Sequence, residues 1–212
     1  MTPTAVAGGL GAILLAGGRA TRVDGASKPL FDVGGRTLLT AAVAAATDAG
    51  ARPITVAAPV LDEALPVSWV REDPPFTGPA AAVLAALTSW PSTDDPAWVL
   101  LLACDLPGIG GAVPLLVEAL PLLPADSDGV CLADAASRPQ WLIGAYRTRV
   151  LRAAASVLPD AGRDAPVRAL LDDLAITVIA ASDDLTRDVD TWEDLNEARQ
   201  RAAHAPLTEE TS

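Results

Sequence analysis

The N-terminal part of the chain places glycines and basic side chains directly after a short apolar run. Residues 12–15 are all apolar, which predicts a buried β-strand, and Gly17 and Gly18 follow it. Glycine lets backbone N–H groups approach a ligand closely, and Arg22 and Lys28 add positive charge a few residues later. Residues of these types at this spacing predict a binding site for a polyphosphate.

The spacing of these glycines excludes two common phosphate-binding loops. The stretch from Gly17 to Thr21 does not supply the pattern G-x-G-x-x-G, and G-x-x-x-x-G-K-S/T occurs nowhere in the chain. A Gly-Gly pair after a strand also fits an ordinary tight turn that leads into a helix. The two cations favour a phosphate site, because the chain as a whole is acidic, with a formal net charge of −12.

A second candidate group follows another apolar run, residues 98–104. Asp105 comes directly after this run, and Pro107 delays the helix that follows, so the carboxylate is expected at the end of a strand. Carboxylate oxygens are ligands that Mg²⁺ prefers in proteins. We interpret Asp105 as a metal ligand, and a solvated aspartate in a turn is the alternative.

The acidic segment near the C-terminus supports two interpretations. Asp188 is a further candidate metal ligand, ranked after Asp105. Asp190 or Thr191, together with Glu193, also matches the capping box at the start of a helix, which would explain these residues without any chemistry.

Strand-like and helix-like segments alternate along the chain, which predicts an α/β fold. The expected architecture is a single-domain, three-layer sandwich in which helices flank a mostly parallel sheet. Ligands of such sheets bind beyond the carboxyl ends of the strands, where Gly17, Asp73 and Asp105 are expected. The expected strands are residues 12–15, 53–58, 67–70, 98–104, 129–132, 141–146 and 175–180, and the expected helices are residues 38–49, 80–89, 113–120, 150–157, 166–174 and 192–203.

Length and composition restrict the class of protein. The 212 residues, half of them hydrophobic, predict one domain over residues 1–203 and a flexible tail over residues 204–212. His204, the only histidine, falls in that tail, so a catalytic histidine is not expected. The acidic balance argues against nucleic acid or an anionic membrane surface as a partner, because phosphate backbones attract basic faces.

The apolar stretches and the cysteines indicate where the protein acts. The apolar stretch at residues 10–16 is too short for an export signal or a membrane span, so a cytoplasmic location is expected. Cys104 and Cys131 lie in strand-like runs without a CxxC pattern, which predicts buried free thiols rather than a disulfide or a metal site.

Taken together, these motifs resemble those of nucleotidyltransferases, and among them the MobA-like molybdenum cofactor guanylyltransferase family. The resemblance starts with Leu15-Ala16-Gly17-Gly18, Arg22 and Lys28. It continues in the family's order over nearly the whole chain, through Glu72-Asp73, Gly78-Pro79, Cys104-Asp105-Leu106-Pro107, residues 140–147 (QWLIGAYR), Gly162-Arg163 and residues 188–195 (DVDTWEDL).

The resemblance implies a Rossmann-like, GT-A-like nucleotide-binding fold and a Mg²⁺-dependent enzyme that transfers GMP from GTP to the phosphate of molybdopterin and releases pyrophosphate. Guanine is implied because Ala-Gly-Gly in the first loop resembles that of the family's guanine users. Transient contact with other proteins of molybdenum cofactor biosynthesis is also implied. The implied site residues are Lys28, Arg22 and Asp105 for catalysis; Leu15, Ala16, Gly17, Gly18, Arg22, Lys28, Asp73, Gly78 and Asp105 for the nucleotide; Asp105 and Asp188 for the metal; and Arg163, Arg168 and Arg138 for the acceptor.

Some positions depart from the family's pattern and leave the acceptor open. Val23-Asp24 and Ser27 stand where the family has other residues, and the segment from Lys28 to Leu39 is also similar to sugar-phosphate nucleotidyltransferases. One alternative is therefore a cytidylyl- or guanylyltransferase that acts on a sugar phosphate, a phospholactate-type compound or another phosphorylated acceptor. Another is a non-catalytic nucleotide-binding accessory or sensor protein.

Overall fold

The computed structural model describes residues 6–17 and 26–204. Within them, seven strands form one sheet in the order β5-β4-β1-β6-β8-β7-β9. β8 runs antiparallel to both of its neighbours, and the other pairings are parallel. The strands are β1 (Leu10–Leu15), β4 (Ile54–Ala57), β5 (Ser68–Val70), β6 (Trp98–Ala103), β7 (Gly129–Ala133), β8 (Pro139–Arg147) and β9 (Ile176–Ala180).

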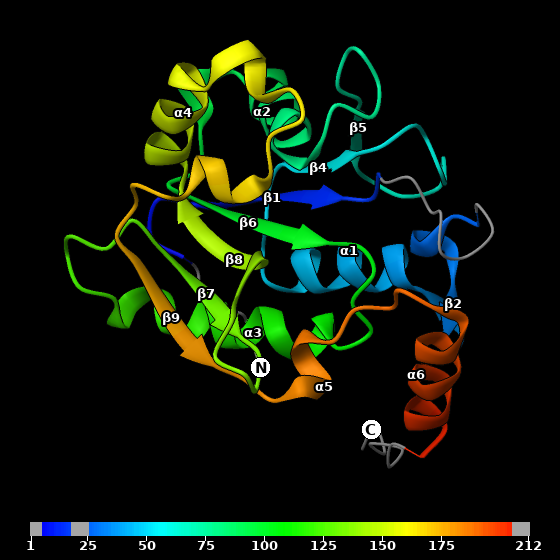
Figure 1. The fold of residues 1–212 in the computed structure, drawn as a ribbon. Helices are drawn as coiled ribbons and strands as arrows, with labels where there is room; N and C mark the ends of the chain where they lie inside the picture. The colour runs from blue at the N-terminus through cyan, green and yellow to red at the C-terminus, as the bar shows by residue number, and fades with distance from the viewer. Residues whose placement is uncertain (1–5, 18–25, 205–212) are drawn as a thin grey trace.

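Helices cover both faces of this sheet. α1 (Leu38–Asp48) and α3 (Ile109–Ala119) lie on one face, and α2 (Pro79–Ser89) and α4 (Thr148–Val157) lie on the other (Figure 1). Successive residues of β1 point to opposite faces, so Ala12 and Leu14 pack with α1 and α3, whereas Ile13 packs with α2. Burial on both faces explains why the strand sequences are continuously apolar, and the predicted three-layer α/β sandwich is confirmed.

The remaining elements are short, apart from the last helix. A two-stranded ribbon and a one-turn helix, α5, were not expected from the sequence. No helix among the described residues combines the length and the hydropathy that crossing a membrane requires. These elements are η1 (Lys28–Leu30), β2 (Asp32–Val33), β3 (Arg36–Thr37), η2 (Ser92–Asp94), η3 (Leu120–Leu122), η4 (Pro159–Gly162), η5 (Val167–Leu170), α5 (Asp183–Thr186) and α6 (Trp192–His204).

The prediction of a helix over residues 166–174 was wrong. The structure has only the 3₁₀ turn η5 there, and Leu171 already leaves the helical conformation with φ −121° and ψ −12°. One turn is enough to bury Val167, Leu170 and Leu171, and the chain must then turn to enter β9 at Ile176. The apolar spacing in this segment therefore corresponds to one buried turn and not to a full helix.

The parallel strands end on one side of the molecule, and this arrangement sets the location of the site. The register pairs Leu15 of β1 with Ala103 of β6, and the N–H of Cys104 donates to the carbonyl of Leu15 over 3.1 Å. Gly17 and Asp105 therefore leave adjacent strands at the same level. In Figure 1 both strands point toward the side where β2, α5 and α6 lie.

Both cysteines are free and buried, as predicted. Burial raises the pKa of the Cys131 thiol to about 12, and burial together with the adjacent Asp105 carboxylate raises the pKa of the Cys104 thiol still further. Both side chains therefore stay protonated and act as small apolar residues of the core.

Candidate active site

Lys28 stands at the centre of the candidate site. It opens η1, where Pro29 fixes the backbone of the first turn. Its side chain is 17% exposed; the ammonium forms an ion pair with Asp190, and its Nζ lies 4.0 Å from Oδ2 of Asp105. Lys28 is also the only lysine in the sequence, since the other fourteen basic residues are arginine. Among the side chains, a compact ammonium charge is thus present at this position alone.

Asp105 leaves β6 in a segment that is tied to the C-terminal part of the chain. The helix after it begins only at Ile109, which confirms the predicted delay. The Asp105 carbonyl accepts a hydrogen bond from the N–H of Val189 over 2.9 Å. This bond aligns Asp105 with the segment that carries Asp188 and Asp190.

A small apolar cluster brings these acidic residues to Lys28. Val189 is 1% exposed and packs in a cluster separate from the two larger cores. Because it points inward, its neighbours Asp188 and Asp190 are left on the other side of the chain, toward Asp105. Phe31 belongs to the same cluster and follows Lys28 by three residues, so the cluster joins η1 to the acidic segment. Its buried members are Phe31, Leu38, Val189, Leu195 and Ala198.

The N-terminus of α6 is capped by Thr191, as the sequence suggested, but its partner is Asp194 and not Glu193. The N–H of Asp194 donates to Oγ1 of Thr191, and the Asp194 carboxylate accepts from the N–H of Thr191 and from that of Asp190. The capping box is therefore Thr191 with Asp194, and the expectation of Glu193 was wrong. The Asp190 carboxylate pairs with Lys28.

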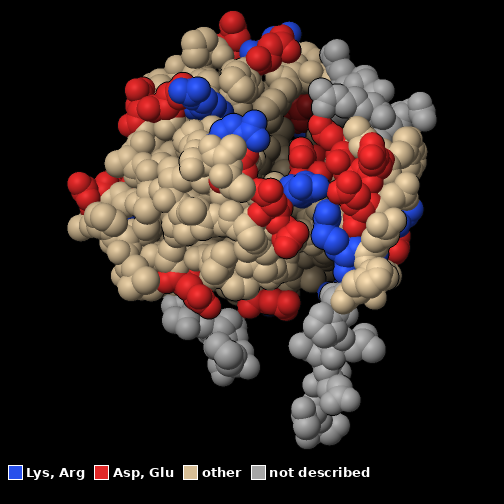
Figure 2. All heavy atoms as spheres, turned by 60° about the horizontal axis from the view of Figure 1, so that its bottom comes forward, with Lys and Arg blue, Asp and Glu red and all other residues tan. Residues whose placement is uncertain are grey.

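The three carboxylates of Asp105, Asp188 and Asp190 form a group with the composition of a metal site. One oxygen from each lies within 4.8 Å of the others. In Figure 2, acidic side chains gather on the right, the side on which Figure 1 places α6, with basic ones among and below them. Hard oxygen donors with more negative charge than one lysine balances fit a divalent cation such as Mg²⁺.

Asp190 is the member of this group that the sequence prediction did not assign to a metal. Its ambiguity came from its place just before α6, which Thr191 and Asp194 now account for. A usable signal was the alternation Asp188-Val189-Asp190, in which one apolar residue separates two acidic ones. In extended chain such alternation places both carboxylates on one side.

Crowding perturbs the acidity of these groups. Burial and the charge of Asp188 raise the pKa of Asp105 to about 6, while Lys28 opposes the rise. Partial loss of surrounding water and the charge of Asp190 raise the pKa of Asp188. The ionised cluster is therefore destabilising until a cation compensates for it.

The predicted nucleotide residues around β1 partly join this site. Leu15 is half-buried, Ala16 is buried and Gly17 is exposed at the strand end. Among the described residues, a Cβ added at Gly17 would meet only the carbonyl oxygen of Ala57, at an ordinary contact distance of 3.4 Å. Gly18 and Arg22 lie outside the described residues.

Asp73 and Gly78 lie farther along the same sheet edge, beyond β4 and β5. Asp73 is exposed in the loop after β5, and Gly78 begins α2 with φ +101°, which favours glycine whatever the residue binds. This loop also holds Phe76 at φ +65°, a conformation rare for a bulky residue. The Phe76 N–H donates to Oε1 of Glu72 over 2.8 Å, which helps hold the loop in place.

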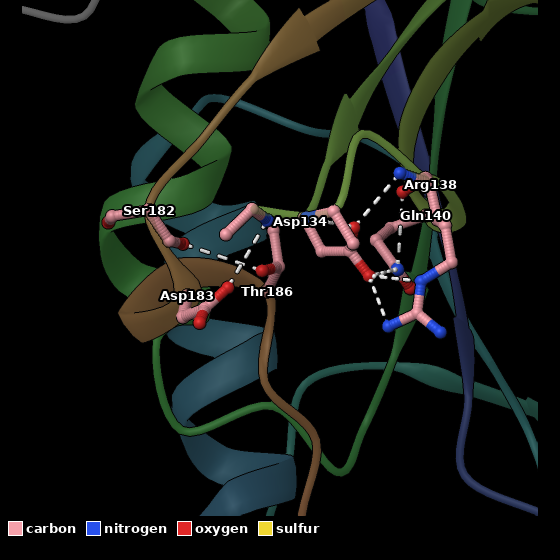
Figure 3. Close-up of polar contacts among 8 residues, drawn as sticks. Asp134, Arg138, Gln140, Ser182, Asp183 and Thr186 are labelled. Atoms are coloured by element: carbon pink, nitrogen blue, oxygen red, sulfur yellow. Dashed lines mark hydrogen bonds and ion pairs between the residues drawn. The ribbon is translucent and has the colours of Figure 1, made fainter.

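The three arginines predicted to bind the acceptor lie on separate elements. Arg138 is in the β7–β8 turn, where its Nε donates to Asp134 over 2.9 Å (Figure 3). Arg168 is in η5 and pairs with Asp172 over 2.8 Å. Arg163 is exposed after η4, in a segment whose next N–H, that of Asp164, donates to the carbonyl of Thr77.

The family model for the MobA-like NTP transferase domain matches residues 12–177. The chain belongs to this family. A "probable molybdenum cofactor guanylyltransferase" from Synechococcus elongatus is 36% identical in an alignment of length 165 that covers 72% of this chain and 79% of that protein. The family relationship makes the chain a nucleotidyltransferase, as its sequence motifs predicted.

Solved structures share the fold at low sequence identity. A nucleotidyl transferase from the genus Methanothermobacter aligns with a TM-score of 0.69 and 22% identity, covering 92% of this chain and 97% of that one. The molybdopterin-guanine dinucleotide biosynthesis protein A of Archaeoglobus fulgidus gives 0.61 and 15%, covering 91% and 98%. The 2-C-methyl-D-erythritol 4-phosphate cytidylyltransferase of Thermus thermophilus gives 0.58 and 18%, also covering 91% and 98%. These likenesses confirm the predicted Rossmann-like class of the fold.

Replacing Asp105 by Asn should stabilise the metal-free protein more as the pH rises. The folded-state pKa of Asp105, about 6, lies above its unfolded value. Ionising Asp105 therefore lowers the free energy of unfolding; this loss grows from about pH 4 to about pH 6 and is constant at higher pH. Relative to wild type, Asp105→Asn should gain about 1 to 3 kcal/mol in the free energy of unfolding at pH 8 and almost nothing at pH 4. Urea denaturation with EDTA present measures this difference. Equal gains at both pH values would contradict the electrostatic cause.

Proposed function

We propose that this enzyme transfers GMP from GTP to the phosphate of molybdopterin and releases pyrophosphate. The observation that carries the proposal is the meeting of Lys28 with Asp105, Asp188 and Asp190 at the strand edge where Gly17 leaves β1. The choice of guanine and molybdopterin is supported by the curated relative's name and by the Ala16-Gly17-Gly18 motif.

The proposed reaction needs charge neutralisation and positioning more than proton transfer. An oxygen of the acceptor phosphate attacks the α-phosphorus of GTP, and the bond from that phosphorus to the bridging oxygen of pyrophosphate breaks. Lys28 supplies a positive charge where the leaving group gains negative charge. Arg22 binds the β- and γ-phosphates of GTP through its planar guanidinium. The acceptor is already ionised, so a histidine base is not required.

Asp105, Asp188 and Asp190 are the residues that would hold Mg²⁺ in this scheme. When bound, the ion neutralises phosphate charge during the transfer. The Lys28 ammonium, which pairs with Asp190 and lies 4.0 Å from Asp105, would place its charge beside the bound nucleotide. Arg138, Arg163 and Arg168 remain proposals for contacts to the acceptor.

We assign the reaction to the cytoplasm, where buried free thiols such as Cys104 and Cys131 persist. GTP and molybdopterin are the proposed substrates. Other proteins of molybdenum cofactor biosynthesis are the proposed transient partners, because the product must be transferred to the protein that uses it.

The reaction itself is tested by incubating the protein with one nucleoside triphosphate, Mg²⁺ and one acceptor at a time. Pyrophosphate release and the mass of the dinucleotide product are measured. GTP with molybdopterin should give both, whereas CTP with molybdopterin, and GTP with a sugar phosphate, should give little. Preferential turnover of another pair would replace the proposed substrates, and nucleotide binding without any turnover would favour an accessory protein.

Asp105→Ala should abolish turnover and leave the fold intact, because this carboxylate destabilises the metal-free protein. The expected loss is at least about a hundredfold in kcat. Asp94→Ala is the matched control. Asp94 is an exposed aspartate that precedes the N-terminal end of β6, whereas Asp105 follows the C-terminal end of that strand. Steady-state rates and circular dichroism of both variants decide the matter. A folded Asp105→Ala protein with near-normal Mg²⁺-dependent rates would exclude the assigned role.

Lys28→Ala should lower kcat more than it weakens GTP binding, because its charge acts mainly on the leaving group. Arg22→Ala should chiefly weaken GTP binding. Lys28→Arg should restore only part of the rate, since a planar guanidinium does not replace a compact ammonium. Steady-state kinetics together with calorimetric GTP affinities distinguish these effects. The reverse pattern would show that the two roles are exchanged.

Gly17→Ala should reduce the preference for GTP over CTP. The position is exposed, and an added Cβ would make only an ordinary contact with the described residues, so the variant should not displace the core. If the larger guanine lies against this backbone, its binding should weaken by about 1 to 3 kcal/mol relative to cytosine. Competition binding of the two nucleotides to wild type and variant measures the ratio. An unchanged ratio would remove Gly17 from the base site.

A further inference from the structure

The position of the acidic segment depends on α5, a helix too short to hold its own place. α5 spans one turn between β9 and the segment that carries Asp188 and Asp190. An isolated turn of this length is not stable in water, so outside contacts must fix it. A residue that determines where α5 lies therefore contributes, together with Val189, to where the two carboxylates lie.

Two hydrogen bonds tie the start of this region to the end of β7. The N–H of Ala181 donates to the carbonyl of Ala133 over 3.0 Å. The N–H of Ala135 donates to Oδ1 of Asp183 over 3.2 Å, so Asp183 joins α5 to the β7–β8 turn (Figure 3). These contacts hold α5 from one side only.

On its other side, α5 packs closely against Gly108, which lies at the start of α3. A Cβ added at Gly108 would lie 2.0 Å from the carbonyl oxygen of Asp184 and 2.7 Å from Cα of Leu185. Both are backbone atoms, which cannot rotate away as a side chain can. Gly108 itself has φ −83° and ψ 5°, which other residues also adopt, so the requirement for glycine is one of space.

This contact and the metal group belong to the same pair of segments. Gly108 follows Asp105 by three residues, and Asp184 precedes Asp188 by four. The two segments meet again where the N–H of Val189 donates to the carbonyl of Asp105. From these contacts we propose that Gly108 is a positioning residue that sets the separation of Asp105 from Asp188 and Asp190 and thereby permits all three to bind one divalent cation. The proposal rests on the metal role in the proposed function.

The sizes involved make the positioning sensitive. A contact of 2.0 Å must open by about 1 Å or more to reach an ordinary separation, because carbon and oxygen atoms do not pack closer than about 3 Å. Mg²⁺ binds ligand oxygens at metal–oxygen distances in a narrow range of about 2.1 Å. A shift of α5 by about 1 Å would therefore carry a carboxylate out of reach of the ion.

Gly108→Ala is the decisive variant, and Gly110→Ala is its matched control. Gly110 lies two residues farther on, and a Cβ there would meet none of the described atoms within 4 Å. Gly111→Ala is an intermediate case, because its Cβ would meet only the flexible Cδ2 of Leu185, at 2.8 Å. The series thus adds the same methyl group to one short segment with three different steric consequences.

The readouts are Mn²⁺ affinity measured by electron paramagnetic resonance without nucleotide, and hydrogen exchange at the Val189 amide measured without metal. Gly108→Ala should weaken Mn²⁺ binding at least about tenfold and speed exchange at Val189, whereas Gly110→Ala should change neither. Circular dichroism verifies the fold. A folded Gly108→Ala protein with wild-type Mn²⁺ affinity would overturn the proposal.

If Gly108→Ala does not fold, a second pair of variants decides. Asp183→Ala removes the acceptor for the Ala135 N–H, whereas Asp183→Asn removes the same charge but keeps an oxygen acceptor. Weaker Mn²⁺ binding and faster Val189 exchange in Asp183→Ala than in Asp183→Asn would support positioning by α5, and equal values would overturn it. A wild-type protein that binds no Mn²⁺ would refute the proposed metal role, whereas unchanged Val189 exchange in Gly108→Ala would refute the role of Gly108.

Discussion

The candidate site depends on a small apolar cluster, separate from the two main cores, to which both Phe31 and Val189 belong. Lys28 and Asp190, which these two residues carry with them, are 162 positions apart in the chain. Nothing local holds them together, and the three carboxylates repel one another. Burial of a side chain such as that of Val189 contributes about 1.5 to 3 kcal/mol, which offsets this repulsion. The chemistry of the site is thus held in place by residues that take no part in it.

The electrostatics of the site follow from that arrangement. Asp105 has a raised pKa because it is buried near another carboxylate, and Lys28 provides only part of the compensation. A cluster of this kind lowers stability and at the same time prepares a place for a divalent cation. The chain's only lysine lies here, whereas its other fourteen basic residues are arginines.

The strands were predictable because each is a continuous apolar run with clear boundaries. Apolar spacing failed at residues 166–174, since it cannot distinguish one buried turn from a helix. At α6 the sequence offered Asp190 or Thr191 with Glu193 as the cap, whereas the structure pairs Thr191 with Asp194 and Asp190 with Lys28. Both errors arose where two interpretations share the same residue types, and only hydrogen bonds or the exit direction of the chain distinguish them.

By itself, the sequence determined the α/β class, the strand ends at Gly17 and Asp105, and the family to which the chain belongs. These features depend on local apolar patterns and on motifs that can be recognised in the sequence alone. Only the tertiary structure decided that Asp190 meets Lys28, that Val189 bonds to Asp105, and that Gly108 leaves room for α5. Such contacts join segments far apart in the chain, and they depend on separations of about an ångström that no residue pattern encodes.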